Sequence, residues 1–320
     1  MRVLVAGGGG FIGSHVCEQL LAAGHEVTCL DNFVTGSADN VSHLEGTAGF
    51  TLLQADVAEA PPVAVDRIMH LASPASPIDY ERLPLETMRA NALGTWRLLE
   101  LAESLSVPLT LASTSEVYGD PLVHPQPEAY WGNVDPIGPR SCYDESKRFA
   151  EALLMASRRA RGVRANIVRI FNTYGPRMRL DDGRAVPELL TAAIRSQPMT
   201  VHGDGTQTRS FCYVTDLVGG ILHVALDDEI DGEVFNVGNP AEITIGELAT
   251  VIRSLAGSTS EIVMVHRPPG DPERRRPDIG KIQARYGWSP TVSLKEGLER
   301  TSQAFRSELA RRGEPVGAES

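Results

Sequence analysis

Tyr143 and Lys147 stand four residues apart in the stretch YDESK, a spacing that places both side chains on one face of a helix. A tyrosine hydroxyl ordinarily loses its proton at about pH 10, but a neighbouring ammonium group favours the phenolate. Such a pair can therefore remove a proton from a substrate hydroxyl group. The alternative is an ordinary tyrosine–lysine pair on a helix surface, because this spacing is frequent by chance.

Three more polar residues follow one another where an apolar strand runs out. The stretch LASTSEVYGD begins as a buried strand and ends as a turn, and it carries Thr114, Ser115 and Glu116 at the change-over. Two hydroxyl groups and a carboxylate at this point can hydrogen-bond a ligand and its reacting oxygens. The alternative is a polar cap or turn after the strand.

The glycine-rich stretch VLVAGGGGFIGSH predicts a strand, a tight turn and a helix start. Two registers fit, Gly8-x-Gly10-x-x-Gly13 and Gly7-x-x-Gly10-x-x-Gly13. Either one lets the backbone approach a pyrophosphate and places that anion at a helix N-terminus. The alternative is a tight turn between strand and helix with no ligand.

Asp31 ends the next strand, EVTCLD, where it can accept both ribose hydroxyls of NAD and repel a 2′-phosphate. No arginine or lysine lies between Asp31 and Arg67, so the sequence favours NAD over NADP. The stretches ADV and HLAS are expected beside the adenosine, although each could simply end a strand. The expected cofactor-binding residues are Gly7, Gly10, Phe11, Ile12, Gly13, Asp31, Asn32, Asp56, Val57, Leu71, Ala72 and Ser73, together with Tyr143 and Lys147.

A parallel sheet must position these residues. Short apolar runs alternate with stretches of helical period, which predicts a doubly wound α/β fold whose ligands bind beyond the carboxyl ends of the strands. The expected strands are 2–6, 26–30, 50–54, 67–71, 108–112, 164–170 and 232–237, and the expected helices are 11–23, 84–105, 143–159, 245–255 and 294–308.

The pattern loosens after residue 170, where proline, glycine and arginine become frequent. We therefore expect an NAD-binding Rossmann domain over 1–171, to which 212–239 returns. A smaller substrate-binding domain is expected over 172–211 and 240–310, and 311–320 is expected to be a disordered tail.

The composition narrows the function classes. The chain has 320 residues, 42% of them hydrophobic, and a formal net charge of −11, which argues against a general binder of nucleic acid or of anionic membranes. Four scattered cysteines without a Cys-x-x-Cys pair indicate reduced thiols in a cytoplasmic protein, with no metal site. We identify no signal peptide and no apolar run long enough to span a bilayer.

Together, these motifs resemble those of the extended short-chain dehydrogenase/reductase family, whose members act on nucleotide sugars. The resemblance covers almost the whole chain and is strongest to the UDP-glucuronate decarboxylases, which make UDP-xylose. The matching blocks are HLASPASPIDY, STSEVYGDP, YWGNVDPIGPRSCYDESKR, RIFNTYGPRM, DGTQTRSFCYVTDLV and DPERRRPDI.

The triplet at 114–116 helps to choose among the activities of this family. Nucleotide-sugar 4,6-dehydratases typically carry Thr-Asp-Glu there, and sugar 4-epimerases usually lack the glutamate. Ser115 argues against the dehydratase and Glu116 against the epimerase, which remain the alternatives among enzymes. A cofactor-sensing binding protein is the alternative outside them, but such proteins commonly lack the Tyr143–Lys147 pair.

The resemblance implies NAD-dependent decarboxylation of UDP-glucuronate through a 4-keto intermediate. Tyr143 would remove the 4-hydroxyl proton as hydride passes to NAD, and the resulting β-keto acid would lose carbon dioxide before NADH returns the hydride. Thr114 and Ser115 would hydrogen-bond the reacting oxygens, and Glu116 would position the sugar or deliver a proton through water. We expect the pKa of Glu116 to be raised, because it would lie beside an anionic substrate.

The resemblance also implies a nucleotide-binding end and a dimer. Asn172 would contact the diphosphate, while Arg209 and Arg275 would clamp phosphate and uridine with their planar guanidinium groups. Arg177 remains open, and Tyr213 would lie near the base or the sugar unless it belongs to the core. Helices 84–105 and 143–159 would pack against a second copy to form a homodimer.

Overall fold

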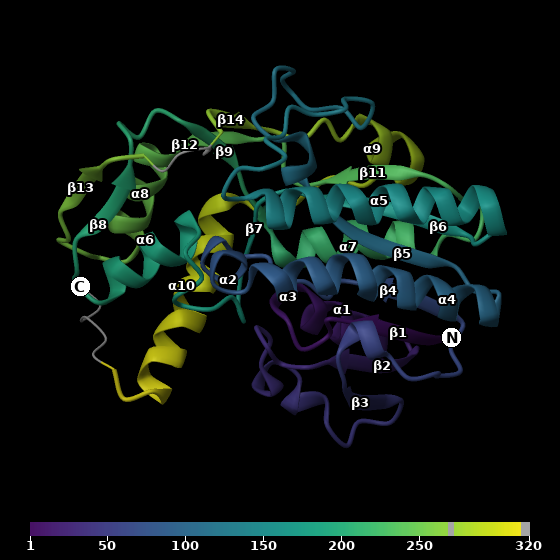
Figure 1. Cartoon of the computed structure of the whole chain (residues 1–320). Helices are drawn as coiled ribbons and strands as arrows, with labels where there is room; N and C mark the ends of the chain where they lie inside the picture. The colour runs from purple at the N-terminus through teal and green to yellow at the C-terminus, as the bar shows by residue number, and fades with distance from the viewer. Residues whose placement is uncertain (268–271, 315–320) are drawn as a thin grey trace.

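A seven-stranded parallel sheet forms the centre of the computed structural model, which describes residues 1–267 and 272–314 (Figure 1). Its strand order, β11-β6-β5-β4-β1-β2-β3, reverses direction from β1 to β4, as in a doubly wound fold. The α/β fold class predicted from the sequence is confirmed. The strands are β1 Arg2–Ala6, β2 Glu26–Asp31, β3 Phe50–Gln54, β4 Arg67–His70, β5 Leu109–Thr114, β6 Ala165–Ile170 and β11 Val234–Val237.

Helices cover both faces of this sheet (Figure 1). Residues of β1 alternate between two cores: Val3 and Val5 pack with the helices of one face, and Leu4 and Ala6 with those of the other. This two-sided burial explains the continuous apolar runs of the strands. One face carries α1 Phe11–Ala22 and α7 Val214–Leu226, and the other carries α3 Pro84–Arg89, α4 Thr95–Leu105 and α5 Ser141–Arg161.

The expected helix 84–105 is not continuous. It consists of α3, a π-helical segment η4 (Ala90–Gly94) and α4. A Cβ atom on Gly94 would lie 2.6 Å from Cγ1 of Val57, so η4 fits closely against the turn that follows β3. Helical periodicity alone could not reveal this interruption, because a π turn changes the hydrogen-bond pattern without removing the helix.

A second region lies beyond the carboxyl ends of the strands (Figure 1). The chain enters it after β6, returns to the sheet through α7 and β11, and leaves again. Its elements are the two-residue strands β7 Thr173–Tyr174 and β10 Cys212–Tyr213, which pair with each other; the pair β8 Met199–His202 and β13 Ile262–Val265; the sheet of β12 Glu242–Thr244, β9 Thr208–Ser210 and β14 Arg274–Arg275; and the helices α6 Ala185–Ile194, α8 Ile245–Leu255 and α10 Leu294–Arg311. The remaining helices are α2 Pro77–Arg82 and α9 Gly280–Tyr286, and the 3-10 turns are η1 Ala38–Asn40, η2 Ser42–Leu44, η3 Val57–Glu59 and η5 Ser115–Tyr118.

The first residues of the expected tail, 311–314, are structured. Helix α10 continues to Arg311, and Glu314 forms an ion pair with Arg195 at the end of α6. The rest of the expected tail, 315–320, lies outside the described residues. Within the described part of the chain, no helix combines the length and apolarity needed to cross a membrane.

Candidate active site

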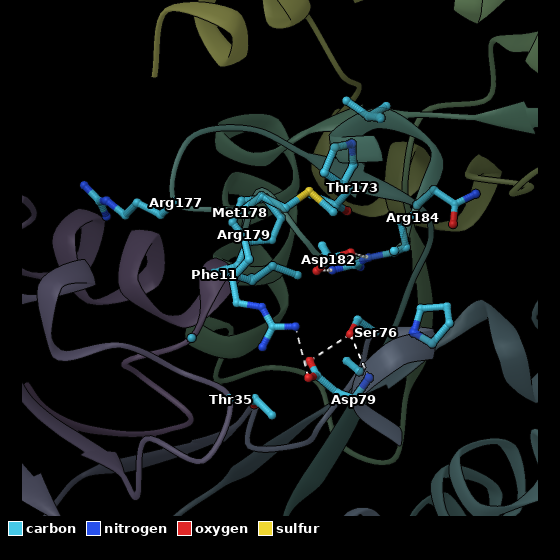
Figure 2. A pocket seen from close by; sticks show the side chains of 18 of the residues that line it. Phe11, Thr35, Ser76, Asp79, Thr173, Arg177, Met178, Arg179, Asp182 and Arg184 are labelled. Carbon is cyan, nitrogen blue, oxygen red and sulfur yellow. Dashed lines mark hydrogen bonds and ion pairs between the residues drawn. The ribbon is translucent and has the colours of Figure 1, made fainter. Parts of the chain in front are cut away.

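A cavity of about 1330 Å³ opens between the carboxyl ends of the strands and the second region. Its walls include the glycine-rich loop, the end of β5, the first turns of α5 and the strap of chain before α6, part of which Figure 2 shows. The fold therefore gathers the separate sequence motifs around one space. Parallel strands bring this about because their carboxyl ends share one edge of the sheet.

The glycine-rich loop has the Gly7-x-x-Gly10-x-x-Gly13 register on the cavity side. Gly7 has a φ angle of 83°, and a Cβ atom there would lie 2.5 Å from the Ala72 nitrogen. A Cβ atom on Gly13 would lie 2.0 Å from the Gly7 oxygen, so α1 begins directly against the turn. Gly8 instead faces the thiols of buried cysteines behind the loop. These close approaches form the bare backbone cradle at a helix start that a dinucleotide pyrophosphate requires.

Asp31 braces this loop from the end of β2. Its carboxylate accepts hydrogen bonds from the Gly9 N–H at 2.9 Å and the Phe33 N–H at 2.8 Å. Burial raises the pKa of Asp31, although both backbone bonds favour its ionised form. The carboxylate therefore fixes the shape of the loop in addition to the ribose contact predicted for it.

Two of the other residues predicted on the adenosine side, Asn32 and Asp56, are joined by a hydrogen bond. Asn32 donates a hydrogen bond to Asp56 at 3.1 Å, and Asp56 accepts one from the Ala58 N–H to begin η3. Of the predicted cofactor-binding residues, the cavity wall contains Gly7, Gly10, Phe11, Ile12, Gly13, Leu71, Ser73, Tyr143 and Lys147. The lining does not include the remaining five, which are Asp31, Asn32, Asp56, Val57 and Ala72.

Tyr143 and Lys147 both line the cavity from the first turns of α5. The Tyr143 ring stacks on Tyr80 with centroids 5.3 Å apart, and its hydroxyl bonds that of Thr114. The Lys147 Nζ donates to the Ala112 oxygen at 2.9 Å and lies 5.9 Å from the centre of the Tyr143 ring. The sequence thus placed the pair on one helix face, and the fold turns that face toward the end of β5.

Burial dominates the electrostatics of this pair. It raises the pKa of Tyr143 to about 12 and lowers that of Lys147 to about 7. Tyr143 on its own is therefore protonated at neutral pH. The phenolate, which Lys147 and the positive nicotinamide ring of NAD would favour together, stays a prediction. Removing either group from water disfavours its charged form by more than the neighbouring side chains favour it.

Thr114 and Ser115 occupy the strand end in two roles. The Thr114 hydroxyl accepts the Glu116 N–H at 3.2 Å and caps η5, so the capping alternative holds for this residue. The same side chain reaches Tyr143. Ser115 is buried and lines the cavity beside it.

Glu116 forms ion pairs with two arginines. One carboxylate oxygen accepts from Arg140, at the N-cap of α5, and the other accepts from Arg275 of β14. Burial acts to raise the pKa of Glu116, but the charges of Arg275 and Arg140 outweigh burial and lower it to about 2. The raised pKa expected of Glu116 beside a bound anionic substrate stays a prediction, and the sequence could not show that two guanidinium groups meet this carboxylate.

The predicted nucleotide-binding residues separate into two groups. Asn172, Arg209 and Arg275 line the cavity, whereas Tyr213 packs against Tyr174, at 5.7 Å between ring centroids, and belongs to the core. Arg177 lies at the rim, where it forms an ion pair with Glu18 of α1 at 2.6 Å. This ion pair connects the second region to α1, the helix that follows the glycine-rich loop.

A family model described as the NAD dependent epimerase/dehydratase family matches residues 3–238. The chain belongs to this family. The match spans the sheet and most of the residues of the cavity wall, including the glycine-rich loop.

Individual relatives extend the likeness to nearly the whole chain. UDP-glucuronic acid decarboxylase 5 of Arabidopsis thaliana is 49% identical over 97% of this chain and 90% of its own length. UDP-glucuronic acid decarboxylase 1 of Xenopus tropicalis is 49% identical over 96% of this chain and 73% of its own. A UDP-glucuronic acid 4-epimerase from Bacillus cereus, solved with UDP-glucuronic acid and NAD, superimposes with a TM-score of 0.86 at 28% identity, covering 96% of this chain and all of that one.

Sequence reasoning missed several cavity residues of this family member. Arg140 and Arg184 each immediately precede a helix, and both line the cavity. Arg184 forms an ion pair with Asp182, and Arg179 bonds Asp79 of α2 at 3.0 Å across the space in Figure 2. The positions of Arg140 and Arg184 just before a helix could have marked them as site residues, but the sequence does not show which helix ends face the site.

Proposed function

We propose that the protein converts UDP-glucuronate to UDP-xylose and carbon dioxide, with NAD as a retained cofactor. One observation carries the proposal: the strand end that faces Tyr143 offers Thr114, Ser115 and an ionised Glu116, and no acid able to expel a hydroxyl group. This arrangement disfavours a 4,6-dehydratase. The relatives named UDP-glucuronic acid decarboxylases support the same substrate.

The residues of the chain would share the reaction as follows. When bound, NAD accepts a hydride from C4 of the sugar and later returns it. Tyr143 takes the 4-hydroxyl proton and gives it back, and the Thr114 hydroxyl, which acts to lower the pKa of Tyr143, would stabilise the phenolate in between. Ser115 would hydrogen-bond the reacting oxygens beside them. The β-keto acid formed at C4 loses its carboxyl group because the electron pair moves into the ketone.

The arginines would hold the charged substrate. Arg209 and Arg275 would bind the diphosphate, and Asn172 would complete that contact. The carboxylates that now neutralise this wall, Glu116 and Asp182, keep the guanidinium groups in place until the substrate supplies its own negative charges. Glu116 is then an anchor for the arginines, and its low pKa argues against its being the proton donor.

Incubation with UDP-glucuronate labelled at the carboxyl carbon, followed by mass analysis of gas and nucleotide product, tests the proposal. We expect labelled carbon dioxide and a UDP-pentose, with no net change in NADH. A nucleotide product of unchanged mass would contradict it and indicate the 4-epimerase. Tyr143→Phe is the matched inactive variant, expected to lose turnover by about 10²- to 10⁴-fold; unchanged turnover would remove Tyr143 from the mechanism.

We also propose that the protein is a homodimer and that it is located in the cytoplasm. Exposed apolar side chains gather on α3, η4 and α4 (Leu85, Met88, Leu93 and Trp96) and on neighbouring α5 (Phe149). These helices are those expected to pack against a second copy, so the exposed side chains support a homodimer.

A further inference from the structure

Decarboxylation consumes one proton in each turnover, and none of the residues assigned so far supplies it. When the bond between C5 and C6 breaks, its electron pair becomes an enolate, and C5 must then gain a proton. Tyr143 returns its own proton to the oxygen at C4, so that proton is not available. The inference below rests on the proposed function and concerns the route by which a solvent proton reaches C5.

A second cavity, of about 270 Å³, lies behind Glu116. Glu116, Arg140 and Arg275 line both cavities, so their ion-paired side chains form the partition between the two. The second cavity extends to Asp120 and Asp135, both of which are exposed. It therefore connects the surface with the far side of the active-site wall.

Asp144 is the buried acid in this second cavity. It follows Tyr143 in the first turn of α5 and is 7% exposed. Its Oδ1 atom is fully buried and has no hydrogen-bond partner among the described residues. A buried, unpaired oxygen in a polar chamber is the kind of group that ordered water satisfies.

The surroundings of Asp144 keep it protonated near neutrality. Burial and the negative charge of Glu116 raise the pKa of Asp144 to about 7, while Arg140 and Arg275 act to lower it. Glu145, the next residue, also raises it. Asp144 thus carries a proton at pH values at which Glu116 carries none.

We propose that Asp144 is the proton-entry residue of the decarboxylation. Its carboxyl group gives a proton to a water molecule held at the Glu116 carboxylate, and that water protonates C5 once carbon dioxide has left. Asp144 then takes a replacement proton from solvent at the outer end of the second cavity. Each turnover moves one proton inward, and no electron leaves or enters the system.

Asp144→Asn tests the proposal, with Glu299→Gln as the control, since Glu299 is an exposed acid on α10 that lines neither cavity. We expect kcat for carbon dioxide release to fall by about 100-fold in Asp144→Asn at constant KM, and to be unchanged in Glu299→Gln. The wild-type kcat should decline as the pH rises through about 7, and Asp144→Asn should lose this dependence. Imidazolium, a small acid of similar pKa, should restore part of its turnover.

Measurements on the free protein separate this role from a structural one. The carboxyl infrared band of the wild type should titrate at about pH 7 and be missing in Asp144→Asn. The folded chain binds this proton more tightly than the unfolded chain, so its contribution to the free energy of unfolding falls as pH rises between the two pKa values. Asp144→Asn should therefore melt no lower than the wild type at about pH 8.

The outcomes are distinct. A wild type that releases no carbon dioxide refutes the proposed function. If the wild type is active, and Asp144→Asn has the same kcat and the same pH profile, the role of Asp144 is refuted. A variant that melts lower and that imidazolium does not rescue makes Asp144 structural and overturns the proposal as well.

Discussion

Glu116 shows how opposing electrostatic effects on one side chain are decided by its neighbours. Burial alone favours the neutral acid, but two guanidinium groups in direct contact favour the carboxylate more strongly. The residue is therefore charged throughout the ordinary working pH range. Its chemistry is that of an anchor for Arg140 and Arg275, which face the space where the substrate's own negative charges are expected.

Glu116→Gln should separate substrate binding from turnover. Glutamine has the same shape but no charge, so it competes less strongly than glutamate with a diphosphate for Arg140 and Arg275. We expect UDP to bind at least as tightly as to the wild type, while carbon dioxide release falls by about 100-fold. Calorimetry with UDP and a carbon dioxide assay measure the two effects. Weaker UDP binding at unchanged turnover would show that Glu116 does not compete for these arginines.

The loop between β1 and α1 is an element defined by backbone contact. Its turn leaves no room for side chains at Gly7 and Gly13, and Asp31 ties it to the end of β2 by accepting the Gly9 N–H. The loop is thus rigid before any ligand arrives. A preformed cradle lowers the entropic cost of binding a cofactor. Tight binding is what the proposed reaction requires, because NADH must stay bound until it returns the hydride.

Gly13→Ala should remove the cofactor site. The added methyl group would lie 2.0 Å from the Gly7 oxygen and push α1 away from the turn. We expect the variant to lose bound NAD and to melt lower than the wild type, measured by cofactor content and thermal unfolding. Gly219→Ala in α7 is the control, since its methyl group would have its nearest neighbour at 3.8 Å, and there NAD content should persist. Full NAD content in Gly13→Ala would contradict this account of the loop.

The whole molecule combines a cavity beyond the strand ends with an apolar outer face on α3, α4 and α5. Leu85 and Leu93 are 75% and 59% exposed on the α3–α4 side, and Phe149 is 50% exposed on adjacent α5. Neighbouring exposed apolar side chains of this size are typical of a surface that another protein covers. Tyr143 and Lys147 lie on α5 as well, so a partner on this face would brace the helix that carries them.

Leu93→Glu should convert a dimer into a monomer. A carboxylate at the centre of this face would be buried without a partner on association. Sedimentation measurements should give twice the chain mass for the wild type and the single chain mass for the variant. Leu122→Glu is the control and should remain dimeric, because this leucine is 82% exposed and belongs to none of α3, α4 and α5. A monomeric wild type would refute the dimer.

Much of this molecule was predictable from local sequence patterns. Alternating apolar strands and helices determined the doubly wound fold, because each strand of a parallel sheet is buried on both faces and reads as an apolar run. The glycine spacing and the Tyr143–Lys147 spacing located two parts of the site, since each pattern depends only on residues that are close together in the sequence. Most expected strands agree with those observed to within two residues.

Tertiary structure decided what depends on distant residues. Arg140 and Arg275 lie 24 and 159 residues from Glu116 in sequence, and only the fold brings their charges onto its carboxylate. The same contacts lower the pKa of Glu116 to about 2, and burial raises that of Tyr143 to about 12. Residue types and spacings are local properties, whereas desolvation and Coulomb interactions depend on every group packed nearby, so the sequence determined which groups could react and the packing determined their charges.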